Sequence, residues 1–103
     1  MDGPMNGIVV RYVYDGDEAE WKRVIDAFLA AIATDPEVQG HFRYVVTIAT
    51  DGVTRTHIGR WDSDEILKTL QARDYFAAFS ETIRGFAGDT LEATRMRVYG
   101  ETG

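Results

Sequence analysis

The stretch Thr54-Arg55-Thr56-His57-Ile58-Gly59-Arg60-Trp61, followed at once by Asp62-Ser63-Asp64-Glu65, contains the signals that decide how this chain folds. β-Branched residues alternate with other types over residues 54–58, which is typical of a strand. His57, Gly59 and Trp61 lie two apart and therefore share one face of that strand. The acidic segment resembles a capping box, with Asp62 as N-cap and Glu65 three residues later, so we expect a helix to begin there.

A hairpin joins this strand, expected over residues 53–61, to an earlier one over residues 42–49. The Asp51-Gly52 pair between them predicts a two-residue type I′ turn, in which both residues have positive φ. That loop length fixes the cross-strand pairs. The pairs on one face are Ile48 with Arg55, Val46 with His57, Tyr44 with Gly59, and Phe42 with Trp61. The other face carries Arg43, Val45, Thr47, Thr54, Thr56, Ile58 and Arg60.

The remaining segments complete a βαββαβ order in one domain, residues 1–103, with residues 1–6 as a loose lead-in. Residues 8–14 predict a strand, and an apolar stripe at spacings of three and four predicts a helix that ends at Asp35-Pro36. A second helical region is expected to break near Arg73-Asp74 and to end at Gly85, before a strand at residues 90–99. Four strands and two helical regions in this order predict a ferredoxin-like α+β sandwich.

Composition and charge exclude several classes of function. The net charge of −6 argues against binding to nucleic acid or to an anionic membrane surface. The chain has no cysteine, and its two histidines are not clustered with carboxylates, so we expect no metal site. No apolar run has the length of a membrane span, and the first residues do not read as a signal peptide. The expected location is the cytoplasm.

Three segments resemble the antibiotic biosynthesis monooxygenase family of dimeric α/β barrels. They are Trp61-Asp62-Ser63-Asp64-Glu65, Arg73-Asp74-Tyr75-Phe76 and the closing run from Leu91 to Tyr99. The resemblance implies a homodimer in which two sheets pack into a barrel. The sequence independently indicates a partner, because the second sheet face is too apolar for full exposure to solvent.

Members of that family include cofactor-independent oxygenases of aromatic polyketides, quinol oxygenases and heme-degrading enzymes. The resemblance to quinol- and heme-acting members implies a histidine in the second helical region, but this chain has Leu70 and Tyr75 there. Heme-degrading members also use an asparagine in the first strand, where this chain has Val9. Heme degradation is therefore disfavoured, and we expect no cofactor.

His57 is the candidate catalytic base, because an imidazole titrates near neutral pH. The alternative is a hydrogen-bonded packing histidine. The candidate substrate-binding residues are Trp61, Tyr44, Gly59, Arg55, Phe42 and Tyr12. A glycine within a strand marks the close approach of a ligand, or simply lets Tyr44 pack over it.

Two functions are compatible with these residues, and whether the chain is an enzyme stays open. In the first, a cofactor-free monooxygenase acts on a hydroxylated aromatic or quinol-type molecule, with Tyr44 and Arg55 orienting its anion and Trp61 stacking on its ring. In the second, a non-catalytic dimeric barrel binds a ligand or serves in stress. The arginines on predicted strands either bind an anion or form ion pairs between subunits.

Overall fold

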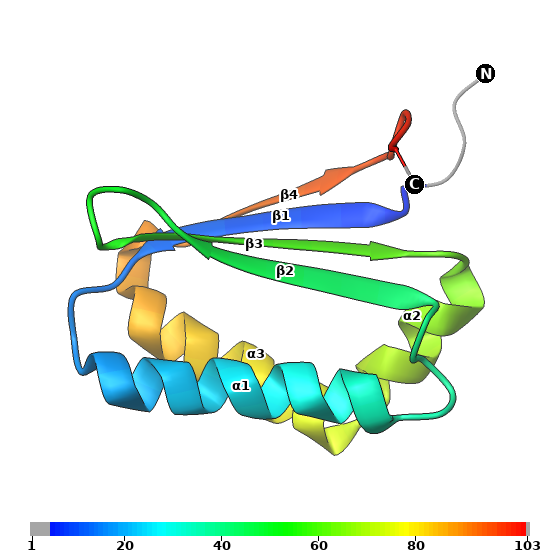
Figure 1. Ribbon diagram of the computed structural model, residues 1–103, viewed down its shortest axis with the longest axis horizontal. Helices are drawn as coiled ribbons and strands as arrows, with labels where there is room; N and C mark the ends of the chain where they lie inside the picture. The colour runs from blue at the N-terminus through cyan, green and yellow to red at the C-terminus, as the bar shows by residue number, and fades with distance from the viewer. Residues whose placement is uncertain (1–4, 103) are drawn as a thin grey trace.

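The computed structural model describes residues 5–102 and shows a four-stranded antiparallel sheet with its helices on one face (Figure 1). Four residues of the expected lead-in, 1–4, lie outside this range. The strands are β1 (Gly7–Val13), β2 (Phe42–Ile48), β3 (Thr54–Trp61) and β4 (Glu92–Met96), in the sheet order β2-β3-β1-β4. The helices are α1 (Glu18–Thr34), α2 (Asp64–Gln71) and α3 (Asp74–Ala87), with a 3-10 turn at Gly88–Thr90. This arrangement confirms the ferredoxin-like prediction.

The β2–β3 register is the predicted one, although the turn is not. His57 is opposite Val46, and Gly59 is opposite Tyr44. Gly52 has a positive φ of 81°, but Asp51 does not, so the turn is not type I′. The Asp51 carboxylate accepts from the backbone N–H groups of Val53 and Thr54 at 2.9 and 2.8 Å. The loop has four residues and is closed by the hydrogen bond from Ala49 N–H to the Thr54 carbonyl. It has the same centre as the predicted two-residue loop, so the cross-strand partners are the same.

The helix boundaries follow local capping chemistry, with two corrections. Asp17 caps α1, and its carboxylate accepts from the backbone N–H groups of Ala19 and Glu20. The N-cap of α2 is Ser63 rather than Asp62, because the Ser63 hydroxyl accepts from the N–H of Ile66. Helix α3 continues past Gly85 and ends before Gly88, whose φ of 59° suits glycine.

The last strand is shorter than expected, and the chain around it is held by Asn6. β4 covers only Glu92–Met96, within the expected 90–99. The Asn6 side chain accepts from the N–H of Val98, and its backbone bonds Met96 and Trp61. Asn6 therefore belongs to the folded part of the chain, at the end of the sheet where β1 begins, and not to a loose lead-in.

The expected break between α2 and α3 is present and is tied to the end of α1. Arg73 and Tyr75 both donate to the Asp35 carboxylate, at 2.9 and 2.8 Å, and Arg73 also contacts Glu37 at 2.8 Å. These hydrogen bonds, Arg73 first, lower the pKa of Asp35 to about 2. The cluster fixes where α3 begins and hence which of its side chains face the sheet.

The core lies between the sheet and helices α1 and α3, which run side by side beneath it (Figure 1). Helix α1 contributes Trp21, Ile25, Phe28 and Ile32. The opposite sheet face has an apolar centre, where Val45 pairs with Ile58 and Ile58 with Val9. Val45 is 54% exposed and Ile58 38%. Among residues 5–102, no helix has the length and apolarity to cross a membrane.

Candidate functional site

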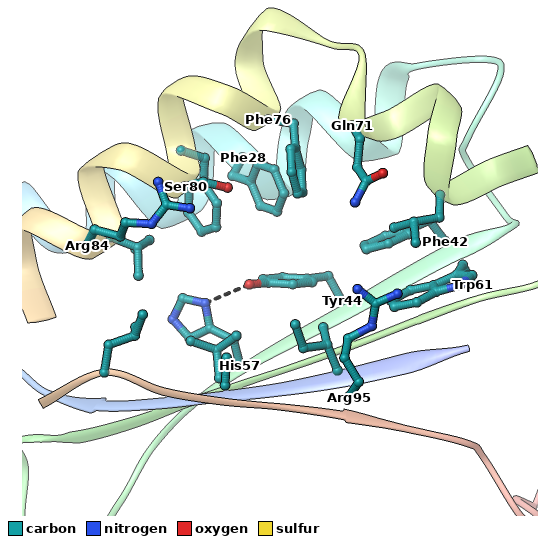
Figure 2. A pocket seen from close by; sticks show the side chains of 17 residues that line it. Phe28, Phe42, Tyr44, His57, Trp61, Gln71, Phe76, Ser80, Arg84 and Arg95 are labelled. Atoms are coloured by element: carbon teal, nitrogen blue, oxygen red, sulfur yellow. Dashed lines mark hydrogen bonds between the residues drawn. The ribbon is translucent and has the colours of Figure 1, made fainter. Parts of the chain in front are cut away.

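A partly open cavity of about 310 Å³ lies between the sheet and the helices (Figure 2). Its walls are mostly aromatic and aliphatic, with a few polar groups, as in many small-molecule sites. The lining residues are Ile8, Val10, Phe28, Phe42, Tyr44, His57, Trp61, Leu67, Gln71, Phe76, Phe79, Ser80, Ile83, Arg84, Leu91, Ala93 and Arg95. Four of the predicted site residues, Phe42, Tyr44, His57 and Trp61, therefore meet at this cavity.

His57 lies at the buried wall of the cavity between two tyrosines. Its Nε2 is 2.7 Å from the Tyr12 hydroxyl, and its Nδ1 is 2.8 Å from the Tyr44 hydroxyl. The side chain is 1% exposed, and burial lowers the pKa of His57 to about 4. The imidazole is therefore neutral near pH 7, with one nitrogen donating and the other accepting.

The neighbouring contacts indicate which group donates in each of the two hydrogen bonds of His57. The Trp21 indole N–H donates to the Tyr12 hydroxyl over 2.9 Å. Tyr12 is buried, so its own proton needs a partner, and His57 Nε2 is the acceptor within reach. His57 Nδ1 then carries the ring proton and donates to the Tyr44 oxygen. This order leaves the proton of the Tyr44 hydroxyl free to point into the cavity.

Tyr44 is thereby placed as a neutral hydrogen-bond donor to whatever occupies the cavity. Burial raises the pKa of Tyr44 well above its ordinary value, so the hydroxyl stays protonated. Its ring meets Phe28 edge to face, with centroids 5.1 Å apart, which fixes its position. Figure 2 shows the hydroxyl reaching His57 across the base of the cavity. A fixed neutral donor at an apolar wall suits a ligand oxygen that carries negative charge.

Trp61 forms the wall at another part of the cavity. It is 2% exposed and stacks on Phe42 with ring centroids 5.9 Å apart. Its indole nitrogen is the one buried side-chain polar atom without a hydrogen-bond partner in the described residues. The Arg95 guanidinium lies 5.3 Å from the Trp61 ring centre. An unpaired buried N–H is costly, so a ligand acceptor at this wall would stabilise the site.

The structure places the other three predicted residues away from the cavity surface. The Tyr44 ring covers Gly59, and a methyl group added there would meet Tyr44 Cδ1 at 3.1 Å. Tyr12 lies behind His57 as its hydrogen-bond partner. Arg55 is buried, forks onto the Glu18 carboxylate at 2.9 and 2.7 Å, and stacks 4.3 Å from the Trp21 ring centre. These contacts give Tyr12 and Arg55 supporting roles.

One face of α3 supplies a wall that sequence reasoning did not assign to the site. Phe76, Phe79, Ser80, Ile83 and Arg84 all line the cavity. They recur at spacings of three and four, so the helical period could have identified them once the sheet face was known. Residues 5–102 contain no group of three metal-ligating side chains.

Comparisons with known proteins identify the fold. No family model and no curated protein match the chain. Among solved structures, SnoaB of Streptomyces nogalater, described as a cofactor-independent oxygenase, is 19% identical with a TM-score of 0.72, covering 96% of this chain and 97% of SnoaB. A Nitrosomonas europaea protein provisionally named an antibiotic biosynthesis monooxygenase is 12% identical with a TM-score of 0.74, covering 100% and 98%.

A third structure resembles this chain and is described as a dimer. It is a dimeric ferredoxin-like protein of unknown function from Jannaschia, 14% identical with a TM-score of 0.68, covering 92% of this chain and 100% of that one. These likenesses confirm the resemblance at the level of the fold.

Proposed function

Because this chain shares its fold with proteins named antibiotic biosynthesis monooxygenases, we propose that it is a cofactor-independent oxygenase of a hydroxylated aromatic or quinol-type small molecule. The observation that carries the proposal is the aromatic cavity in which the Tyr44 hydroxyl is fixed by His57. A flat ligand fits walls made of Phe42, Trp61 and Phe76. Its oxygen would accept a hydrogen bond from the Tyr44 hydroxyl.

The chemistry would need an electron-rich anion of the substrate in a dry site. A phenol or enol that has lost its proton transfers electrons to oxygen, and the substrate supplies all of them. In an anthrone-type substrate, a CH₂ group becomes C=O, one oxygen atom enters the product, and the other leaves as water. Tyr44 would stabilise the developing oxyanion, which is a role for a preorganised neutral donor.

The contacts of His57 favour orienting Tyr44 over direct proton removal. Both ring nitrogens are engaged by tyrosine hydroxyls, and burial makes the imidazole a weak base. A direct base role for His57 stays a prediction, and two variants separate the roles. If His57 orients Tyr44, then Tyr44→Phe and His57→Gln should each lower kcat by about ten- to a hundredfold. If His57 is the base, only His57→Gln should do so.

A second candidate function is ligand binding without turnover. It is favoured by the same observation, because no ring nitrogen of His57 is left to face a ligand. Oxygen-electrode measurements with anthrone and a naphthalenediol decide between the two. Oxygen uptake at the rate of the uncatalysed reaction, together with a raised melting temperature, would leave only the binding function. His41→Gln, at the chain's exposed histidine, is the matched control and should retain parent activity.

The outer face of the sheet is the proposed dimer interface. Its apolar centre, formed by the exposed Val45 and Ile58 and the half-buried Val9, needs a cover, and the Jannaschia protein of the same fold is described as dimeric. Two copies joined through this face would leave each cavity on the helix side of its own sheet. The cavity is thus complete within one chain.

A further inference from the structure

Two hydrogen-bond donors lie at the Trp61 wall of the cavity, the buried Trp61 indole N–H and the exposed Arg95 guanidinium, and the described residues supply an acceptor to neither. The Trp61 indole N–H is buried and unpartnered among residues 5–102, and the Arg95 guanidinium lies over the same ring. Arg95 is opposite Ile8, which is opposite Gly59, so the register places Arg95 on the helix side of the sheet. Figure 2 shows its side chain rising from β4 toward Trp61.

The charge around this cavity has one sign. Arg55, Arg60 and Arg73 each have a carboxylate within 2.9 Å, whereas the described residues give Arg84 and Arg95 no such ion pair. None of the residues that line the cavity is acidic. The chain as a whole carries −6, so a cavity whose two charged lining residues, Arg84 and Arg95, are both cationic differs in sign from the protein as a whole. A positive site within a negative protein selects for anions.

We propose that the ligand is an aromatic acid whose carboxylate binds at the Trp61–Arg95 wall. The guanidinium supplies charge and a planar pair of donors, and the indole N–H supplies the third donor. The ligand's ring then lies along the aromatic wall, with its hydroxyl at Tyr44. This inference rests on the proposed binding of a hydroxylated aromatic, and it adds the acidic group.

Arg84 is the other cation at the cavity, but it does not share this arrangement. It projects from α3 on the His57 side of the cavity in Figure 2, apart from Trp61 and Arg95. The unpartnered buried donor is at Trp61, so the carboxylate belongs at Arg95. The two arginines therefore serve as a comparison that locates the anion.

Calorimetric titration with 6-hydroxy-2-naphthoate and its neutral analogue 6-hydroxy-2-naphthamide tests the proposal. The parent should bind the acid about tenfold or more tightly than the amide, because a charge-assisted hydrogen bond replaces a neutral one. Arg95→Met should abolish this preference, and Arg95→Lys should keep part of it. Trp61→Phe, which retains a stacking ring without the N–H, should weaken binding of the acid several-fold. Thermal melts establish that each variant is folded.

Arg23→Met is the control for net charge, because Arg23 is exposed on α1 and does not line the cavity. It should leave the preference for the acid within about threefold of the parent value. Equal binding of acid and amide by the parent, or loss of the preference in Arg84→Met but not in Arg95→Met, would overturn the inference. If neither probe binds, the ligand-binding cavity and the proposed function both fail. Preference for the acid without oxygen uptake would remove only the oxygenase.

Discussion

The neutral state of His57 predicts that the protein loses stability in mildly acidic solution. Burial lowers the pKa of His57 from 6.5 to about 4, so the unfolded chain takes up a proton in a pH range where the folded chain does not. Stability contributed by the neutral imidazole is therefore present near pH 7 and is lost as the pH falls from 6.5 to 4. The groups that face the ring, Tyr12 and Tyr44, are neutral throughout this range.

The size of the effect follows from the two pKa values. Each unit of difference corresponds to about 1.36 kcal/mol, so the full shift is worth about 3 kcal/mol. Between pH 7 and pH 5, above the range in which most carboxylates titrate, the loss amounts to about 2 kcal/mol. That is a large part of the stability of a small domain, which is about 5–15 kcal/mol.

Urea unfolding at pH 7 and pH 5, followed by circular dichroism, measures this loss in the parent and in His57→Gln. Glutamine does not titrate, so the variant should lose about 2 kcal/mol less stability than the parent on going from pH 7 to pH 5. The control His41→Gln removes the exposed histidine and should keep the parent's loss. Equal losses in the parent and in His57→Gln would refute the argument that the ring is held neutral.

Three further predictions concern packing, charge and assembly. Gly59→Ala should lower the free energy of unfolding by about 1 kcal/mol in urea, because the new methyl group meets Tyr44, and Tyr44→Ala should remove that cost. Arg55→Met should lower the free energy of unfolding by about 2 kcal/mol, because Arg55 donates to the Glu18 carboxylate. Calorimetry should show unchanged naphthoate affinity, since Arg55 does not line the cavity. A selective loss of affinity would instead make Arg55 a ligand-binding residue. Light scattering at micromolar concentration should give about twice the 11.6 kDa chain mass, and Ile58→Lys should reduce it to one; a monomeric parent would contradict the barrel interface.

The strand pairing was predictable because the Asp51-Gly52 pair marks the centre of the turn, and that centre determines the partners. A loop of two residues or of four between β2 and β3 gives the same partners, so an incorrect turn type did no harm to the placement of His57 and Trp61. Because side chains alternate along a strand, both residues then lie on the face that packs against the helices. Helix boundaries near Asp17 and Pro36 were likewise local matters of capping and backbone restriction.

The site itself needed three-dimensional information. A sequence contains no signal that Tyr12 and Tyr44 take up both nitrogens of His57, because those bonds depend on side-chain direction across three strands. The same holds for Gly59, whose gap is filled by Tyr44 in the folded chain. Arg84 and Arg95 meet one cavity only after α3 is placed by the cluster around Asp35.

The shortness of α2 has a consequence for how firmly one part of the cavity wall is held. This helix has eight residues, of which Leu70 alone is buried, yet it supplies Leu67 and Gln71 to the cavity wall. Helices this short are marginal without tertiary support, so α2 should unfold locally while the sheet and α3 stay intact. Amide protons of α2 should then exchange with deuterium faster than those of α3 and slow down when a ligand occupies the cavity. The part of the cavity wall that Leu67 and Gln71 form would then fluctuate while the sheet stays fixed, so the shape offered to a ligand would vary at the α2 end.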